Sequence, residues 1–360
     1  MGQNAEAGKE SGRFSYIDSL RGIAALLVVF EHYFVPLLGG TAGHFIWYYV
    51  FEPGKIGVIW FFIISGFVIP FSLKDRPGAL RDFAISRFFR LYPTYWLSIA
   101  MLLLAAYLAG VAWPSKRQIL ANLTMFQTAL GVADISSVYW TLFIELVFYI
   151  VCAVAFRLGL LKQLGFKFSM LVGMMLVAMV LGGARGLHDV KYPLALPLGL
   201  SVMFFGAIWR EALIEGSAAA RKIIPACLLV YCVTMPVTFY LGYNSDMGYA
   251  ETWTRYVCSY AFAISTFLLL TGKFHITNRF WVWTGSISYA VYLFHSLVKG
   301  TIGYLTYGKG FGGFEISFAS LVAMLLVSHL VHVLFEQRFI NLGHSLRRRF
   351  SARPAVPLKA

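Results

Sequence analysis

The chain has 360 residues, of which 59% are hydrophobic and 13% charged, with a formal net charge of +14 and a mean hydropathy of +0.71. A soluble domain is about 45–50% apolar and about 25% charged, so this composition excludes an ordinary soluble protein. The positive charge does not indicate nucleic-acid binding, because the Lys and Arg residues lie mainly between apolar runs, as in the positive-inside pattern of membrane proteins.

Apolar runs long enough to cross a bilayer recur along the whole chain. A spanning helix needs about 20 mostly apolar residues, and the long runs lack the alternation of a barrel strand. The sequence predicts ten such helices, at 19–39, 55–73, 91–112, 137–156, 168–183, 193–209, 223–241, 255–271, 280–298 and 314–335. We therefore expect an all-α fold, a polytopic membrane helix bundle of about ten transmembrane helices.

The distribution of basic residues predicts how this bundle is oriented. If the N-terminus is cytoplasmic, most of the 30 Lys and Arg residues fall on the cytoplasmic side, which predicts an N-in and C-in topology. The expected organisation is a polar cytoplasmic N-terminus at 1–15, a transmembrane domain at 16–345 and a basic cytoplasmic tail at 346–360. No loop is long enough for a soluble domain, so chemistry is expected inside the bundle or at its rims.

The first predicted helix carries Arg21 and His32, eleven positions apart. At about 100° and about 1.5 Å per residue they share one face, about 16 Å apart, with Arg21 at the cytoplasmic rim and His32 near mid-bilayer. Glu31 points elsewhere and cannot hold the His32 ring from the same helix. Polar groups at membrane depth usually mark function. The alternative is a structural histidine bonded to a neighbouring helix.

Further polar residues accompany the second, third and fourth predicted helices. Ser65 and Gly66 favour close helix packing. Arg87 and Arg90 stand at i, i+3 and would form a phosphate clamp, with positive-inside anchoring as the alternative. Glu145 needs a partner at its depth, which could be an arginine, a sugar hydroxyl or His32. A carboxylate that only ties two helices together is the other interpretation.

The last two predicted helices each carry a polar stripe. Ser288, Tyr292 and His295 are separated by four and three residues, with Tyr289 at the edge of the stripe. Such a stripe lines a cavity more often than it faces lipid, although interhelical hydrogen bonds alone would also explain it.

A second stripe, formed by His329, His332 and Glu336 at i, i+3, i+7, indicates a metal only weakly. We expect it to be satisfied by protein partners. The four cysteines show no metal-ligand spacing, and no metal site is predicted.

Five stretches occur in an order that identifies a family: "DSLRGIAALLVVFEH", "WFFIISGFVI", "RFFRLYPTYW", "YWTLFIELVFY" and "GSISYAVYLFHSLV". Over about residues 15 to 345, the chain resembles the acyltransferase 3 family of membrane O-acyltransferases, which acylate sugars and lipids. One departure is Arg338, which stands where the family often has proline. Some members carry a fused extracytoplasmic hydrolase-like domain, which is not seen here, so transfer is expected to be completed within the membrane domain.

The resemblance implies which residues form the site. The family motifs map onto Arg21 and His32, Arg87 and Arg90, Glu145, and Ser288, Tyr289, Tyr292 and His295. We expect His32 to be the catalytic base, with Glu145 or His295 orienting its ring or stabilising its protonated form. An acyl-histidine intermediate remains an alternative.

The remaining mapped residues are expected to hold the substrates. Arg21, Arg87 and Arg90 would bind the phosphates of the donor. From their depth and chemistry, Ser288, Tyr289 and Tyr292 are candidate substrate-binding or oxyanion-stabilising groups.

The resemblance also implies the donor, the acceptor and the location. The donor would be acyl-CoA, most simply acetyl-CoA, with no metal. The acceptor would be a hydroxyl of a glycan or lipid-linked sugar at a bacterial cytoplasmic (inner) membrane. Membrane lipid is an expected partner and nucleic acid is not; a homo-oligomer remains open. Two other hypotheses are a proton-coupled exporter of a small molecule and a non-catalytic subunit of a glycan assembly complex.

Overall fold

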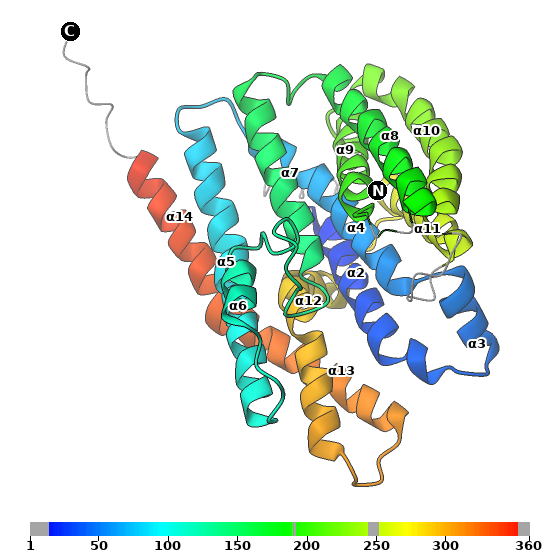
Figure 1. The fold of residues 1–360 in the computed structure, drawn as a ribbon. Coiled ribbons are helices and arrows are strands. Elements are labelled where there is room, and N and C mark those ends of the chain that lie inside the picture. Colours follow the sequence, from blue (N-terminus) through cyan, green and yellow to red (C-terminus); the bar gives the residue numbers. More distant parts are fainter. Residues whose placement is uncertain (1–13, 189, 191, 244–251, 352–360) are drawn as a thin grey trace.

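The computed structural model describes residues 14–188, 190, 192–243 and 252–351. Most of the expected polar N-terminus and the end of the basic tail lie outside these residues. The described part folds into helices, and the connections between them vary in length (Figure 1). The helices are α2 (Ser15–Tyr33), α3 (Ala42–His44), α4 (Pro53–Val68), α5 (Ala79–Leu108), α6 (Lys116–Leu123), α7 (Trp140–Arg157), α8 (Leu164–His188), α9 (Ala195–Leu213), α10 (Ala218–Tyr243), α11 (Trp253–Gly272), α12 (Arg279–Thr306), α13 (Gly313–Val331) and α14 (Gln337–Ser351).

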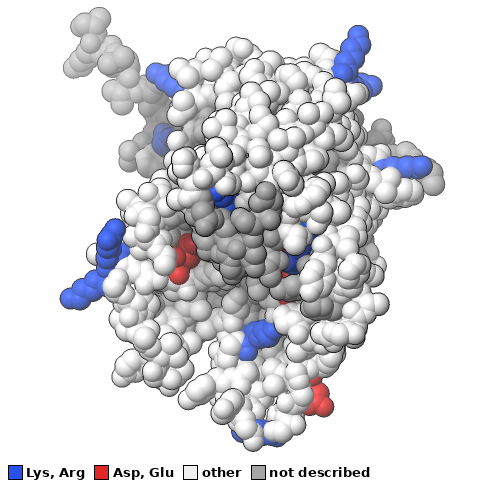
Figure 2. Space-filling view, turned by 45° about the vertical axis from the view of Figure 1, so that its right-hand side comes forward, with Lys and Arg blue, Asp and Glu red and all other residues white. Residues whose placement is uncertain are grey.

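The helical membrane bundle expected from the sequence is confirmed. Each of the ten predicted ranges coincides with a long helix, α2, α4, α5 or one of α7 to α13. Among the described residues, eight helical stretches are long and apolar enough to cross a membrane; α11 and α12 are not among them. The face drawn in Figure 2 is mainly uncharged, with Lys, Arg, Asp and Glu at isolated places, as a lipid-facing surface requires.

Two helix boundaries differ from the prediction in ways that affect the site. α5 begins at Ala79 rather than at residue 91, because the arginine-rich segment before the apolar run is itself helical. α2 ends at Tyr33 rather than at residue 39. His32 therefore lies in the last turn of α2, nearer the end of the helix than the sequence indicated.

Four helices, α2, α4, α9 and α12, form the centre of the bundle, with α2 packed on both α4 and α12 and α4 packed on α9. Glycines allow these close approaches. A Cβ at Gly285 would overlap the Asp18 carbonyl group on α2, and one at Gly66 would overlap the Met203 carbonyl group on α9. Small residues at helix crossings are a general device of membrane proteins, because they let backbones approach.

The chain returns to this centre through α13 and α14. A π-helical turn, His332–Glu336, joins the two helices, and α14 then packs along α5 (Figure 1). Gly343 of α14 lies against Phe89 of α5, where a Cβ would be 2.9 Å from the phenylalanine Cβ. This packing brings the C-terminal part of the chain to the site.

Candidate active site

A cavity of about 680 Å³ lies at the centre of the bundle, between α2, α4, α5, α7, α9, α12 and α14. Of the described residues, five arginines from four helices line it, whereas only two carboxylates do, those of Asp18 and Glu145. The arginines are Arg21, Arg87, Arg90, Arg210 and Arg347. Arg90 and Arg210 are each paired with a carboxylate outside this lining, Glu336 and Glu215. The other three guanidinium groups in a concave site favour an anionic ligand, above all phosphate.

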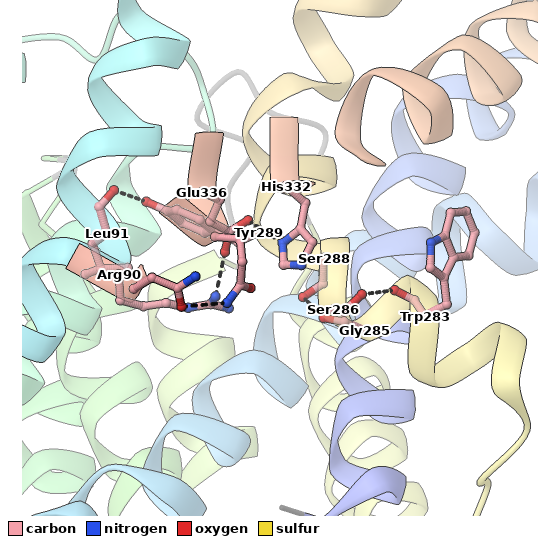
Figure 3. Close-up of polar contacts among 11 residues, drawn as sticks. Arg90, Leu91, Trp283, Gly285, Ser286, Ser288, Tyr289, His332 and Glu336 are labelled. Carbon is pink, nitrogen blue, oxygen red and sulfur yellow. Dashed lines mark hydrogen bonds and ion pairs between the residues drawn. The ribbon is translucent and has the colours of Figure 1, made fainter. Parts of the chain in front are cut away.

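The structure brings Arg21, Arg87 and Arg90 to this one cavity. Arg90 forms an ion pair with Glu336, at 2.5 Å between Nη1 and Oε1. Glu336, whose side chain has no exposed surface, also lies 3.0 Å from Nδ1 of His332. Figure 3 shows Arg90 of α5 beside these two residues of the π-helical turn. Arg90, one residue of the predicted arginine pair, is thus bound by a carboxylate of the protein. His332 and Glu336 of the predicted stripe interact with protein partners, as expected.

Glu145 lies in the cavity wall and accepts two hydrogen bonds. Its Oε1 is 2.5 Å from the Tyr149 hydroxyl and 3.3 Å from the Ser65 hydroxyl. Ser65 therefore lines the cavity as well as flanking the packing glycine. Glu145 lines the same cavity as the arginines. His32 is not one of the residues that line this cavity.

Three of the four residues of the polar stripe of α12 line the cavity, whereas the fourth, His295, does not. Ser288, Tyr289 and Tyr292 are buried and line it. The Tyr289 hydroxyl donates to the Leu91 carbonyl at 2.9 Å, and the Ser288 hydroxyl to Gly285 at 2.8 Å (Figure 3). The Tyr292 hydroxyl is 2.8 Å from the Thr141 hydroxyl. These hydroxyl groups are held by protein acceptors, so the walls of the cavity are fixed by hydrogen bonds.

His32 and His295 form a second group beyond the cavity. Their ring centroids are 5.0 Å apart. In each ring Nδ1 lies 2.8 Å from a backbone carbonyl oxygen of its own helix, that of Val28 for His32 and that of Tyr292 for His295. A carbonyl oxygen can only accept, so Nδ1 carries the proton. In a neutral ring this leaves Nε2 with a lone pair that can accept a proton.

Tyr292 is close to both the cavity and the histidine pair. It lines the cavity, and its ring centroid is 6.2 Å from that of His295. His295 is completely buried, whereas His32 is exposed at the end of α2. The predicted residues thus fall into two neighbouring groups, the cavity residues and the histidine pair, joined through α12.

Sequence reasoning missed Arg210 and Arg347, which it counted only as cytoplasmic charges. Arg210 donates to the Phe67 carbonyl at 3.2 Å and lies over the Phe71 ring at 4.4 Å from its centroid. Arg347 belongs to a basic run in which the sequence pattern does not single out one arginine. The spacing of Gly343 and Arg347, one helical turn apart on a common face, was the available signal.

With this geometry established, comparison with known proteins identifies the family. Residues 14–333 match the family model described as an acyltransferase domain, acyltransferase 3. The chain belongs to the acyltransferase 3 family. The chain is thus a multi-pass membrane acyltransferase, and the resemblance read from the five motifs is confirmed.

Two named proteins are similar to the chain over most of its length. The chain is 23% identical over 301 residues to "Putative acetyltransferase ORF330" of Acidianus two-tailed virus, covering 80% of this chain and 84% of the relative. It is 24% identical over 322 residues to "Nodulation protein 10" of Rhizobium leguminosarum bv. viciae, covering 81% and 84%. No solved structure matches the chain significantly. The helix α14 lies beyond the residues that the acyltransferase 3 model matches.

Proposed function

We propose that this acyltransferase moves an acyl group, most simply acetyl, from cytoplasmic acyl-CoA to a sugar hydroxyl of an exported glycan, such as an exopolysaccharide or lipopolysaccharide. The cavity with five arginines is the observation that carries the donor assignment, because CoA is a polyanion at one end. The neutral pantetheine arm would extend through the cavity toward α12. The protein would lie in a bacterial inner membrane with both termini in the cytoplasm.

The histidine pair supports the chemical step. A sugar hydroxyl is a weak nucleophile at neutral pH, and Nε2 of His32, which the Nδ1 hydrogen bond leaves as the acceptor of a neutral ring, would take its proton. The alcohol oxygen attacks the thioester carbonyl, the C–S bond breaks, and the protonated His32 returns its proton to the CoA thiolate. The products are the sugar ester and CoA thiol. Two charged rings this close would repel each other, so we do not assign His295 a share of the positive charge. We propose instead that it positions His32.

The position of Tyr292 adds a condition to this mechanism. Since Tyr292 lines the cavity and lies near His295, a thioester that reaches the histidine pair from the cavity would pass its ring. A rotation of that side chain, with loss of the Thr141 hydrogen bond, would open the way. On this proposal the acyl carbon would lie at the boundary between the cavity and the outer end of α2.

The test is release of CoA thiol by the purified protein, given acetyl-CoA and a bacterial exopolysaccharide. The wild type should release thiol only with the glycan, and His32→Ala should abolish release. His188→Ala, which changes an exposed histidine at the end of α8, is the matched control and should keep full activity.

Three results would contradict the proposal. Equal thiol release by wild type and His32→Ala would remove His32 from the mechanism. Movement of a small molecule across liposomes without thiol release would favour a proton-coupled exporter. Glycan acylation in cells that carry His32→Ala would favour a non-catalytic subunit.

A further inference from the structure

A second pocket, of about 370 Å³, adjoins the central cavity beside the α4–α5 connection. Its wall includes Lys74 and Arg76 of that connection, Asp82 and Arg87 of α5, and Arg347 of α14. Arg87 and Arg347 line both spaces, so the two pockets meet at these arginines. The pocket lies on the side of the bundle where the basic loops predict the cytoplasm.

The charge of this pocket is positive once its internal ion pairs are counted. Asp82 is 2.9 Å from Arg76 and 3.2 Å from Arg81, so its carboxylate is neutralised by neighbours on its own side. Arg87, Arg347 and Lys74 remain as cations facing the pocket. Such a surplus favours an anion with several oxygen acceptors.

Arg87 and Arg347 also have unused hydrogen-bond donors. The Nε atoms of both are buried and, within the part of the chain that the structure describes, have no hydrogen-bond acceptor. Buried donors are nearly always paired in folded proteins, and an exception calls for an explanation. A bound phosphate would supply the missing acceptors, because guanidinium groups bind phosphate oxygens through parallel N–H donors.

The position of Arg347 depends on α14. This helix packs along α5, with Gly343 against Phe89, and Arg347 lies one turn further on the same face. Arg348 and Arg349 follow it and are exposed. One arginine of the basic run is thus selected by the helix face, and α14 lies outside the part of the chain that the family model matches.

We propose that the second pocket binds the phosphorylated nucleotide end of the acyl donor, with Arg347 and Arg87 on one phosphate group. This inference rests on the proposed function, because it assumes a CoA thioester as donor. The rest of the donor then extends from this junction past the other arginines of the central cavity. Arg347 is a binding residue for the donor phosphates and takes no part in the chemical step.

The test compares three donors in the purified full-length protein: acetyl-CoA, its 3′-dephospho form and S-acetylpantetheine, which has no nucleotide. The variant is Arg347→Met, which keeps an apolar stem, and the matched control is Arg348→Met on the exposed side of α14. Loss of a charged hydrogen bond should raise the KM for acetyl-CoA about tenfold to a hundredfold. The KM for S-acetylpantetheine should be unchanged, and Arg348→Met should equal the wild type.

Two results would overturn this inference. An equal rise in KM for S-acetylpantetheine would show that Arg347 only supports packing. An effect of Arg347→Met that appears in nanodiscs of anionic lipid and vanishes in zwitterionic lipid would assign the pocket to a lipid headgroup. Arg347→Lys, which keeps the charge, should bind acetyl-CoA better than Arg347→Met does. Its activity also shows that a protein substituted at this position folds.

Direct titration of CoA separates this inference from the proposed function. CoA binding that Arg347→Met weakens, with no transfer to any glycan, would support the pocket and overturn the acyl-transfer proposal. Transfer with the same KM in wild type and Arg347→Met would overturn the pocket alone. Absence of CoA binding to the wild type would overturn both.

Discussion

The rings of His32 and His295 lie with their centroids 5.0 Å apart, although the two residues are far apart in the sequence. Tyr33, which follows His32 on α2, is 262 positions from His295. The end of α2 is tied to the interior of α12 at this point. The Tyr33 hydroxyl donates to the His295 carbonyl at 2.6 Å, and the Lys299 ammonium group donates to the His32 carbonyl. The pair is therefore a fixed feature of the crossing of α2 and α12, which suits a site where one ring positions another.

The first prediction concerns this pair. Replacing His32 by Ala removes the proposed base, and kcat should fall by about 10²–10⁴. His295→Ala should lower kcat less, because His295 acts through His32. The double variant should be no slower than His32→Ala alone, as expected for residues that act as a unit. Thiol-release assays on folded protein measure all three, and additive losses would argue against a shared role.

The second prediction concerns the Arg90–Glu336 ion pair. Glu336→Gln leaves a partly buried guanidinium without its carboxylate, and should destabilise the protein by about 3–5 kcal/mol. The double variant Arg90→Met, Glu336→Met should recover part of this loss, because no charge remains unpaired. Unfolding midpoints in detergent report both effects. If the single and double variants were equally unstable, the pair would not act as a buried salt bridge.

The third prediction tests the helix crossing beneath the cavity. Gly66→Ala would force α4 away from the Met203 carbonyl on α9 and should cost about 1–3 kcal/mol of stability. Gly173→Ala is the matched control, since a Cβ there meets nothing within 4 Å in α8. Alanine favours the helix by about 0.5–1 kcal/mol at such a site. Its unfolding midpoint should stay equal or rise, and a fall in both variants would count against the crossing.

The fourth prediction concerns pH. Burial alone would raise the pKa of Glu52, which lies just before α4, but Lys55 and Arg255 outweigh it and lower the pKa below the ordinary 4.5. A lowered carboxyl pKa stabilises the folded state above the ordinary value. That stabilisation is lost as the pH falls through the lowered value.

Glu52→Gln should therefore be less stable than the wild type at pH 7. The gap between the two unfolding midpoints should close on acidification below about pH 4.5. A gap that stayed constant with pH would show that Glu52 contributes by packing alone.

The sequence predicted the bundle and much of the site for identifiable reasons. Arg87 and Arg90, and the stripe from Ser288 to His295, follow helical spacing that can be read directly. Arg87, Arg90, Ser288, Tyr289 and Tyr292 line one cavity, in agreement with that spacing, whereas His295 lies beyond it. The chemical roles of all these residues stay predictions. Glu145 was noticed because a carboxylate is costly in an apolar run.

Other features depend on tertiary packing and carry no local signal. The Arg90–Glu336 pair joins residues 246 positions apart. Arg347 reaches the cavity only because α14 folds back along α5. α5 begins earlier than predicted because the arginines expected in a loop lie within the helix and line the cavity. Charge alone does not distinguish a basic loop from a basic helix end.

The most direct test of the account is acyl transfer across a membrane. The purified protein is placed in liposomes with isotope-labelled acetyl-CoA only on the side of the two termini, and with the glycan acceptor only on the other side. Label should appear on the glycan with wild type and His188→Ala, and should not appear with His32→Ala. Label that appears only when the donor is on the opposite side, or equally with His32→Ala, would contradict it.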